Sequence, residues 1–469
     1  MLRSLNARNG SQSGFLIGLG RRWMSAKTTV MSFGDGSQGA LGLASSIGLG
    51  FDAYEPTPIT TLPPDVCGVT AGHYHSLAVT SQGQVWAWGR NSELQLGRGY
   101  SWLQLNSRPF ELQRKFCLIY LKREQWNEPQ KVEGLDQVKV AATFASGVVS
   151  AATGDDGTLW VWGKSKRGQL GLGKDMTEAV SPSRVEALLG HEIVKVSLGW
   201  GHALALSKDG NLFGWGYYSD GRLGKIGKTF EASPLDSHSI AGKVKSSSCE
   251  NSNVMIEAAE QLVLEAIEKE KDMPIIWEPT QIEELHDVDV IDVACGLDHS
   301  LVLCSDGTLL SSGSNVYGQL GRAKDDLGFH AVDMKFSGPR PIRIASGLGH
   351  SLAICTNILS EDGTNNVVTW GWNQSFQLGR EGSENIPLAV AGLDGVGPTS
   401  VSGGRVHSLA VTGKGEVWSW GCGRNGRLGL GSSIDEPEPM LIEQLEGREV
   451  LQAVAGFDHN LVLLNDASY

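Results

Sequence analysis

Six histidines recur at the same place in a repeated segment, and imidazole is the side chain best suited to act as a general base or a metal ligand near neutral pH. A catalytic or metal-binding histidine is needed once per site, whereas a group present in every repeat is expected to serve the repeat itself. We therefore predict that these histidines are structural and hydrogen-bond the local backbone. They are His75, His202, His299, His350, His407 and His459, and Ser150 stands at the equivalent place in one further copy.

Other residues that could do chemistry also lack the required pattern. The glycine-rich runs 168–173 and 426–431 resemble phosphate loops, but they lack the Lys-Ser or Lys-Thr ending and the strand–loop–helix order. The seven cysteines contain no Cys-x-x-Cys pair, so they indicate neither a zinc site nor a secreted disulfide framework. The sequence therefore predicts a protein that is not an enzyme and that binds no metal and no cofactor.

One segment, residues 98–125, combines basic and aromatic side chains, the composition that contacts single-stranded RNA through phosphate pairing and base stacking. The alternatives are a loop at the edge of the fold and an isoform-specific insert. The net charge of −13 argues against coating nucleic acid by bulk charge. The candidate RNA or partner contacts are Arg108, Arg114, Lys115, Lys122 and Arg123.

The repeat itself predicts the elements that must position these residues. In four copies the histidine precedes the Trp-Gly position by 13 residues, as from His75 to Trp88, and the period along the chain is near 50. From Ser150 to Trp162 the distance is 12 residues. Each unit contains four short strand-like segments, with Asp-Gly pairs such as Asp209-Gly210 expected to form type I′ hairpin turns. Four strands in about 50 residues describe one blade of a β-propeller.

Seven such units predict an all-β fold, a single seven-bladed β-propeller over residues 30–469. The chain ends after a half repeat at His459, and the missing Trp-Gly half stands near the N-terminus at 31–42. One blade is therefore expected to pair N-terminal with C-terminal strands, which closes the ring and leaves no open edge. The 61 glycines are consistent with many tight turns and with crowded strands.

Two insertions interrupt the period, near 100–126 and near 225–279. Within the second, residues 254–271 place apolar side chains on one helical face and five glutamates over much of the remainder. The sequence predicts one inserted helix there. It is expected to pack on its own propeller, with a partner-binding helix as the alternative.

Residues 1–24 contain four arginines and no acidic residue, which is typical of an organellar transit peptide. The segment Arg21-Arg22-Trp23-Met24-Ser25 resembles a mitochondrial processing site with cleavage before Ser25. Mitochondrial location, in the matrix, is the prediction. A chloroplast address and a basic tail that touches nucleic acid in the nucleus are the alternatives. No apolar run reaches the roughly 18 residues that a membrane-spanning helix needs.

The combined pattern Gly-x-x-His-Ser-Leu-Ala followed by Trp-Gly-x-Asn-x-x-Gly-Gln-Leu-Gly resembles the regulator of chromosome condensation repeat family, and more narrowly a plant-type mitochondrial member. The resemblance covers residues 30–469. It implies a seven-bladed propeller that often serves as a scaffold. Some members are nucleotide exchange factors for the GTPase Ran, some bind chromatin, and one plant group senses ultraviolet-B light. That group carries repeated Gly-Trp-Arg-His-Thr segments, whereas this chain has tryptophan only at Trp200, with Leu297, Leu348 and Phe457 at the equivalent positions.

The function expected from this resemblance is a non-enzymatic scaffold for protein, or RNA–protein, assemblies in mitochondria. Similar organellar propellers of plants are linked to transcript splicing and to the biogenesis of respiratory complex I. The expected partners are proteins, either splicing factors or a small GTPase, with RNA reached through such partners and no chromatin binding. The alternative function is guanine-nucleotide exchange on a small GTPase.

Overall fold

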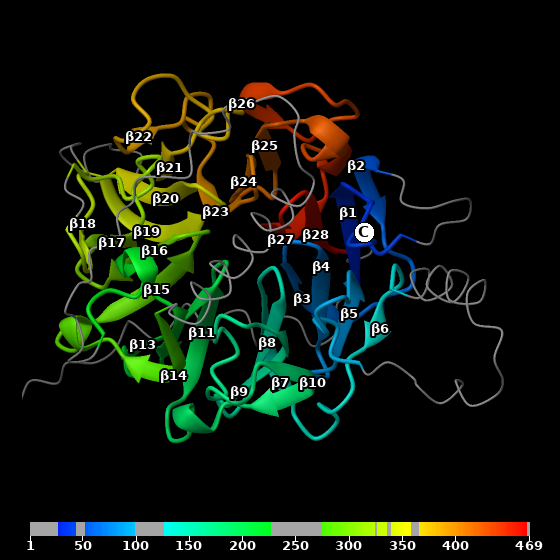
Figure 1. Ribbon diagram of the computed structural model, residues 1–469. Helices are drawn as coiled ribbons and strands as arrows, with labels where there is room; N and C mark the ends of the chain where they lie inside the picture. Colours follow the sequence, from blue (N-terminus) through cyan, green and yellow to red (C-terminus); the bar gives the residue numbers. More distant parts are fainter. Residues whose placement is uncertain are drawn as a thin grey trace, which may run out of the picture.

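The computed structural model describes residues 27–43, 52–98, 126–226, 274–323, 326–334, 339–357 and 365–466. These residues form seven four-stranded antiparallel sheets arranged in a ring (Figure 1). The predicted seven-bladed propeller is therefore confirmed. The transit peptide at 1–24, nearly all of the insertion at 100–126 and the helix expected at 254–271 lie outside the described residues.

Each sheet is one blade, numbered here in chain order, and its first strand lies nearest the ring axis, where it contacts the first strands of both neighbouring blades. Blade 1 comprises β3 (Val66–Ala71), β4 (His75–Thr80), β5 (Val85–Gly89) and β6 (Gln130–Lys131); blade 2 comprises β7 (Val140–Ala145), β8 (Val149–Gly154), β9 (Leu159–Lys164) and β10 (Glu178–Arg184); blade 3 comprises β11 (Ile193–Leu198), β12 (His202–Ser207), β13 (Leu212–Tyr217) and β14 (Ile275–Gln281).

The second half of the ring repeats the same order. Blade 4 comprises β15 (Val290–Cys295), β16 (His299–Cys304), β17 (Leu309–Gly313) and β18 (His330–Ala331); blade 5 comprises β19 (Pro339–Ser346), β20 (His350–Asn357), β21 (Asn365–Gly371) and β22 (Leu388–Ala389); blade 6 comprises β23 (Pro398–Gly403), β24 (His407–Thr412), β25 (Val417–Gly421) and β26 (Glu436–Leu441). The helices in the described residues are short 3-10 turns: Glu186–Leu188, Ser219–Gly221, Glu283–Leu285, Arg424–Gly426 and Glu443–Leu445. No helix in this part of the chain is long and apolar enough to cross a membrane.

Blade 7 combines the two ends of the chain, with β27 (Glu449–Ala455) and β28 (His459–Asn465) joined to β1 (Thr28–Gly34) and β2 (Ala53–Pro58). β1 pairs with β28 over its whole length, from Thr28 opposite Asn465 to Gly34 opposite His459. In Figure 1 the blue strands β1 and β2 lie directly beside the red strands β27 and β28. The closure expected from the two half repeats is therefore present, and it leaves no unpaired central strand.

Strand register corrects one assignment made from spacing. His75, the first residue of β4, lies opposite Gly89, and in blade 2 the residue opposite the equivalent Gly163 is Val149. Val149 therefore occupies the histidine position, and Ser150 occupies the following position, that of Ser76. The separation from this position to the tryptophan is then the same in blade 2 as in blade 1.

The hairpins between second and third strands also differ from the type I′ turns that Asp-Gly suggests. Gly210 is left-handed with φ 82°, but Asp209 is not, and a type I′ turn needs positive φ at both positions. Gly210 N donates to Ser207 O at 3.0 Å, and Ser207 N donates to Asn211 O at 2.9 Å. These bonds describe a type I turn followed by a left-handed glycine.

The blades are joined by buried tryptophans on their third strands. Trp162 of blade 2 is fully buried, and its Nε1 donates to the carbonyl of Gln95 at 2.9 Å. Gln95 belongs to the segment of blade 1 that corresponds to Gly-Gln-Leu-Gly. Trp88, Trp215, Trp370 and Trp420 make the equivalent bond to the preceding blade. Blade 4 has Ser312 in this place, and there Phe329 packs against Gly224 of the preceding blade.

Candidate functional site

The five basic residues singled out from the sequence, Arg108, Arg114, Lys115, Lys122 and Arg123, lie outside the described residues, and their role stays a prediction. The described residues instead gather aromatic and charged side chains on one face of the ring. We call it the loop face. It carries the loops between the first and second strands of each blade and the loops that follow each third strand.

The centre of the loop face is built on the glycine of each Gly-x-x-His segment. A Cβ on Gly296 would lie 2.1 Å from Cε1 of His299 and 2.8 Å from the carbonyl oxygen of Gly347 in the next blade. Gly347 and Gly404 are confined in the same way, by their own histidine and by the next carbonyl. A cavity of about 220 Å³ at the ring axis is lined mainly by first-strand residues and by these glycines.

Each buried histidine contacts the second strand of the next blade. Ser150 Oγ donates to the carbonyl of Gln95, so its oxygen is left to accept a hydrogen bond from His75 Nε2, 2.7 Å away. The neutral imidazole therefore carries its proton on Nε2. The other five pairs are His202–Ser300, His299–Ser351, His350–Ser408, His407–Asn460 and His459–Ser76, at 2.8–3.0 Å.

These contacts give the histidines a structural role, but not the bond to local backbone expected from the sequence. The acceptor is a side chain of the neighbouring blade. Burial lowers the pKa of His75, His299, His350 and His459 to about 3 and that of His407 to about 4. In the part of the chain that the structure describes, no three His, Cys, Asp or Glu side chains are grouped to hold a metal ion.

The junction of blades 2 and 3 departs from this pattern at three positions together. Val149 replaces the histidine, Ala203 replaces the serine that would face it, and Ser146 replaces the glycine three residues before the histidine position. Gln169 connects the two blades here, since its Nε2 donates to Gly199 O at 2.6 Å and to His202 O at 3.0 Å.

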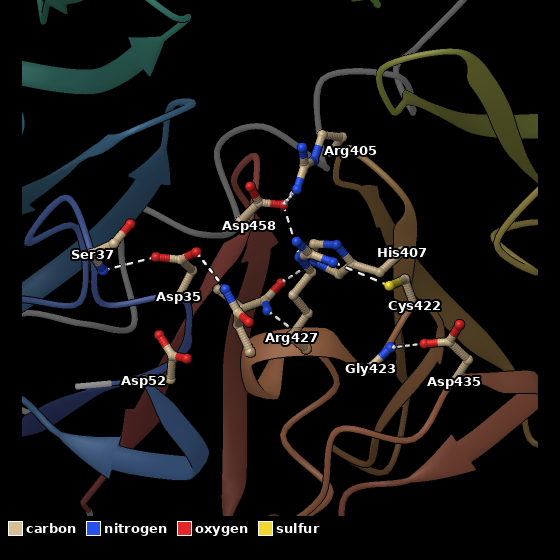
Figure 2. Close-up of polar contacts among 12 residues, drawn as sticks. Asp35, Ser37, Asp52, Arg405, His407, Cys422, Gly423, Arg427, Asp435 and Asp458 are labelled. Atoms are coloured by element: carbon tan, nitrogen blue, oxygen red, sulfur yellow. Dashed lines mark hydrogen bonds and ion pairs between the residues drawn. The ribbon is translucent and has the colours of Figure 1, made fainter. Parts of the chain in front are cut away.

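Two junctions carry a buried arginine where four others carry the glutamine of Gly-Gln-Leu-Gly and blade 7 carries Ala40. Arg222 of blade 3 pairs with Asp298 of blade 4 at 2.6 Å, and Arg427 of blade 6 pairs with Asp458 of blade 7 at 2.8 Å. Figure 2 shows Asp458 between Arg427 and a second guanidinium, that of Arg405, at 2.9 Å. Burial raises the pKa of Asp458, and the two arginines oppose this rise. Arg427 is almost fully buried, so loss of Asp458 would leave its charge without this partner in the interior. The ion pair therefore links blade 6 to blade 7, the blade that closes the ring.

Aromatic rings stack across the centre of the loop face. His73 lies between Phe457 of blade 7 and Trp200 of blade 3, with ring centroids 4.7 and 5.1 Å away. Blade 2 lies between His73 and Trp200 in the ring and has Gly147 there, whose Cβ would lie only 2.7 Å from His73 Nδ1. The stack therefore depends on that small residue, and Trp200 remains 38% exposed. We call His73, Tyr74, Trp200 and Phe457 the central aromatic cluster.

Guanidinium groups cover rings in and beside this cluster. Arg405 lies 4.8 Å from the centroid of Phe457, and Arg90 lies 5.3 Å from that of Tyr74. Arg167 lies 5.6 Å from the ring of Tyr217 in blade 3. Such cation–π pairs hold long side chains in place before any partner arrives. Exposed Trp, Tyr and Arg side chains held in this way are the usual energetic centres of protein interfaces.

Most of this surface was not identified from the sequence. The central aromatic cluster occupies the two variable places of the Gly-x-x-His segments, as in Gly72-His73-Tyr74-His75 and Gly456-Phe457-Asp458-His459. The repeat could have indicated this surface, because residues that vary between repeats at one place on a ring face are candidates for partner contact. Of the cluster, only Trp200, as an isolated tryptophan, and Phe457, as a residue at the equivalent position, were named from the sequence.

Comparison with known proteins places these features in context. A family model described as "RCC1-like domain" matches residues 29–462. The chain is 28% identical to the ultraviolet-B receptor UVR8 of Arabidopsis thaliana, over 89% of this chain and 78% of the receptor. It is 26% identical to the RCC1 domain-containing protein RUG3, mitochondrial, of the same plant, over 81% of this chain and 88% of that protein.

A crystal structure of Prp20p from Saccharomyces cerevisiae, described with its binding properties to Gsp1p and histones, has the same fold. The TM-score is 0.70 at 21% identity, and the match covers 97% of this chain and 95% of that one. At this identity the likeness concerns the propeller alone.

Proposed function

Because the chain belongs to the RCC1-like domain family, we propose that it is a non-enzymatic scaffold that binds protein partners through its loop face. The observation that carries the proposal is the central aromatic cluster with its stacked arginines. Trp200 is exposed, His73 stacks on both Trp200 and Phe457, and Arg405 lies over Phe457.

The closed ring of blades supports this role because it holds the loops that carry the cluster in fixed positions. The loops that carry the cluster are joined by backbone hydrogen bonds around the axis, such as Phe457 N to Gly72 O at 3.2 Å and His73 N to Ser146 O at 3.1 Å. A partner then meets side chains that are already ordered, so that less conformational entropy is lost on binding.

We place this scaffold in mitochondria, in the matrix. The arginine-rich, acid-free segment 1–24 supports this location, and one relative bears the word mitochondrial in its name. The finer proposal, an RNA–protein assembly that takes part in transcript splicing and complex I biogenesis, rests on the resemblance to plant organellar propellers.

The test is purification of the tagged full chain from isolated mitochondria, with partners measured by quantitative mass spectrometry. Trp200→Ala and Arg405→Ala are compared with Leu189→Ala, which removes a side chain that is 49% exposed on the opposite face. We expect the same partners with wild type and Leu189→Ala, and a loss of about tenfold with the other two variants. Equal recovery in all variants would contradict a role for the loop face. Recovery of the protein only outside mitochondria would contradict the location.

The alternative is nucleotide exchange on a small GTPase, since Prp20p, which shares the fold, is described as binding Gsp1p. If a GTPase is the main protein recovered, and if catalytic amounts of this chain accelerate its release of labelled GDP, exchange replaces the scaffold proposal. Recovery of splicing factors or unspliced organellar transcripts, absent from a tag-only control, supports the finer assembly.

A further inference from the structure

A second group of apolar side chains lies on the loop face, away from the central aromatic cluster. It belongs to the loops that follow β17 and β21, in neighbouring blades 4 and 5 (Figure 1). Val316 is 79% exposed, Tyr317 43% and Phe376 45%. The rings of Tyr317 and Trp372 lie 5.5 Å apart, and Phe376 belongs to the turn that directly follows Trp372, where its N–H donates to Asn373 O at 3.3 Å. We call these four residues the apolar ridge.

Phe376 adopts a backbone conformation that is unfavourable for its residue type. Its φ is +62°, and the equivalent positions Gly168 and Gly318 are glycines at φ +69° and +74°. A left-handed conformation is an outlier for a bulky side chain. It is expected to weaken folding by about 1 kcal/mol or more relative to glycine.

Leu94 shows how such strain is offset elsewhere in the same molecule. It occupies the equivalent place in blade 1, also with φ +62°, but its side chain is only 7% exposed. Burial of the leucine side chain compensates for the backbone conformation. Nearly half of the Phe376 side chain remains exposed to water. Burial of this side chain therefore compensates for the backbone conformation much less than burial of Leu94 does, so the stability of the fold does not account well for phenylalanine here.

The surroundings of the ridge are acidic. Gly371, just before Trp372, donates its backbone N–H to Glu384 O at 2.8 Å, and the side chain of Asn385 packs over Gly318, next to Tyr317. Glu381 and Glu384, both exposed, therefore lie on the segment that borders the ridge. The guanidinium of Arg380 in this segment is buried and donates to the carbonyls of Glu381, Ser383 and Ile386. The whole chain carries a net charge of −13.

We propose that the apolar ridge docks a protein segment in which aromatic or aliphatic anchors are flanked by lysine and arginine. The anchors would cover Val316, Tyr317 and Phe376, and the basic flanks would meet Glu381 and Glu384. This proposal deepens the proposed scaffold function and rests on it, because it names the chemistry of one partner segment on the same face.

The two left-handed positions provide a matched pair of variants. Phe376→Gly removes the exposed ring and relieves the backbone, so the melting temperature stays equal or rises while docking is lost. Leu94→Gly removes a buried side chain at the same turn position, so the melting temperature falls. A lower melting temperature for Phe376→Gly would show that the ring serves folding, and would overturn the proposal.

The binding probe is a display library of random dodecapeptides, selected on the full chain and counter-selected on Phe376→Gly. Enriched peptides are then synthesised with a fluorescent label and measured by anisotropy. We expect aromatic or leucine anchors with basic flanks, binding weakened about tenfold or more by Phe376→Gly or by Glu381→Gln with Glu384→Gln, and unchanged by Leu189→Ala. Acidic peptides, no enrichment, or binding that is unchanged by Glu381→Gln with Glu384→Gln would each overturn the proposal. Binding of labelled oligouridylate that depends on Phe376 would assign the ridge to RNA and overturn it as well.

The purification experiment separates this proposal from the scaffold function. If partners are lost with Trp200→Ala but kept in full with Phe376→Gly, the scaffold stands and the ridge proposal fails. If no partner depends on either residue, the scaffold function itself fails.

Discussion

Single residues with no side chain set the geometry of the loop face. Gly296 packs between the ring of His299 and the carbonyl of Gly347, although its backbone is not in the left-handed region. Its requirement is therefore one of space and not of conformational freedom. Any added atom must displace either a buried imidazole or the backbone of the next blade, and neither can move easily in a closed ring.

Gly296→Ala should therefore lower the free energy of unfolding, by about 1–3 kcal/mol as for other overpacked interiors. Gly413→Ala is the control, because the nearest atom to a Cβ there is Thr399 Cγ2 at 3.7 Å and its φ is also outside the left-handed range. Urea unfolding of both variants measures the difference. Equal stabilities would show that the ring of glycines yields to a methyl group.

Among the elements, the junction of blades 2 and 3 differs from the other six. His75 reaches Ser150 across the preceding junction, but Val149 and Ala203 offer no such bond. Ser146 is consistent with this difference, because a side chain at that place would collide with an imidazole at 149, as Gly72 shows with His75. The three departures are physically coupled.

Val149→His alone should destabilise the protein by about 1–3 kcal/mol, since the ring meets Ser146 and finds no partner at Ala203. In a background of Ser146→Gly with Ala203→Ser, the same change should be less harmful by at least about 1 kcal/mol, because the histidine then has space and an acceptor. A mutant cycle followed by urea unfolding measures this coupling. Additive effects would mean that the three positions are independent.

At the scale of the whole molecule, six buried neutral histidines make the stability of the propeller depend on pH. Their folded pKa values lie well below 6.5, mostly near 3, because burial disfavours the charged imidazolium. Below pH 6.5 the unfolded chain binds protons that the folded ring does not bind. Stability is therefore complete above this pH and is lost progressively as the pH falls toward the folded values.

We predict that the free energy of unfolding is constant above about pH 7 and falls between about pH 6.5 and 5, a window above the ordinary range of carboxyl groups. Each histidine contributes a slope of up to about 1.4 kcal/mol per pH unit. Urea unfolding across this range measures the total slope. A stability that does not change from pH 7 to 5 would contradict burial of neutral histidines in the ring.

The propeller was predictable from the sequence because a repeat is a local signal. The recurring strand–turn–strand pattern, the constant distance from His75 to Trp88 and the half repeats at both ends are read without any contact between distant residues. They determined the number of blades and the closing pair of β1 and β28. The spacing placed the histidine position of blade 2 one residue too late, at Ser150 instead of Val149. The correct position follows from strand register, which depends on which residues lie opposite each other on neighbouring strands.

Only the tertiary structure shows which side chains contact each other across the junctions between blades. The partner of each histidine, the pairing of Arg427 with Asp458 and the stack of His73 on Trp200 join residues that lie far apart along the chain or belong to different repeats. No local pattern encodes those distances, because they follow from the closed ring, which brings loops of separate repeats to one face. The sequence by itself determined a propeller, and only the packing of its blades determined the aromatic and arginine-rich surface that we propose binds partners.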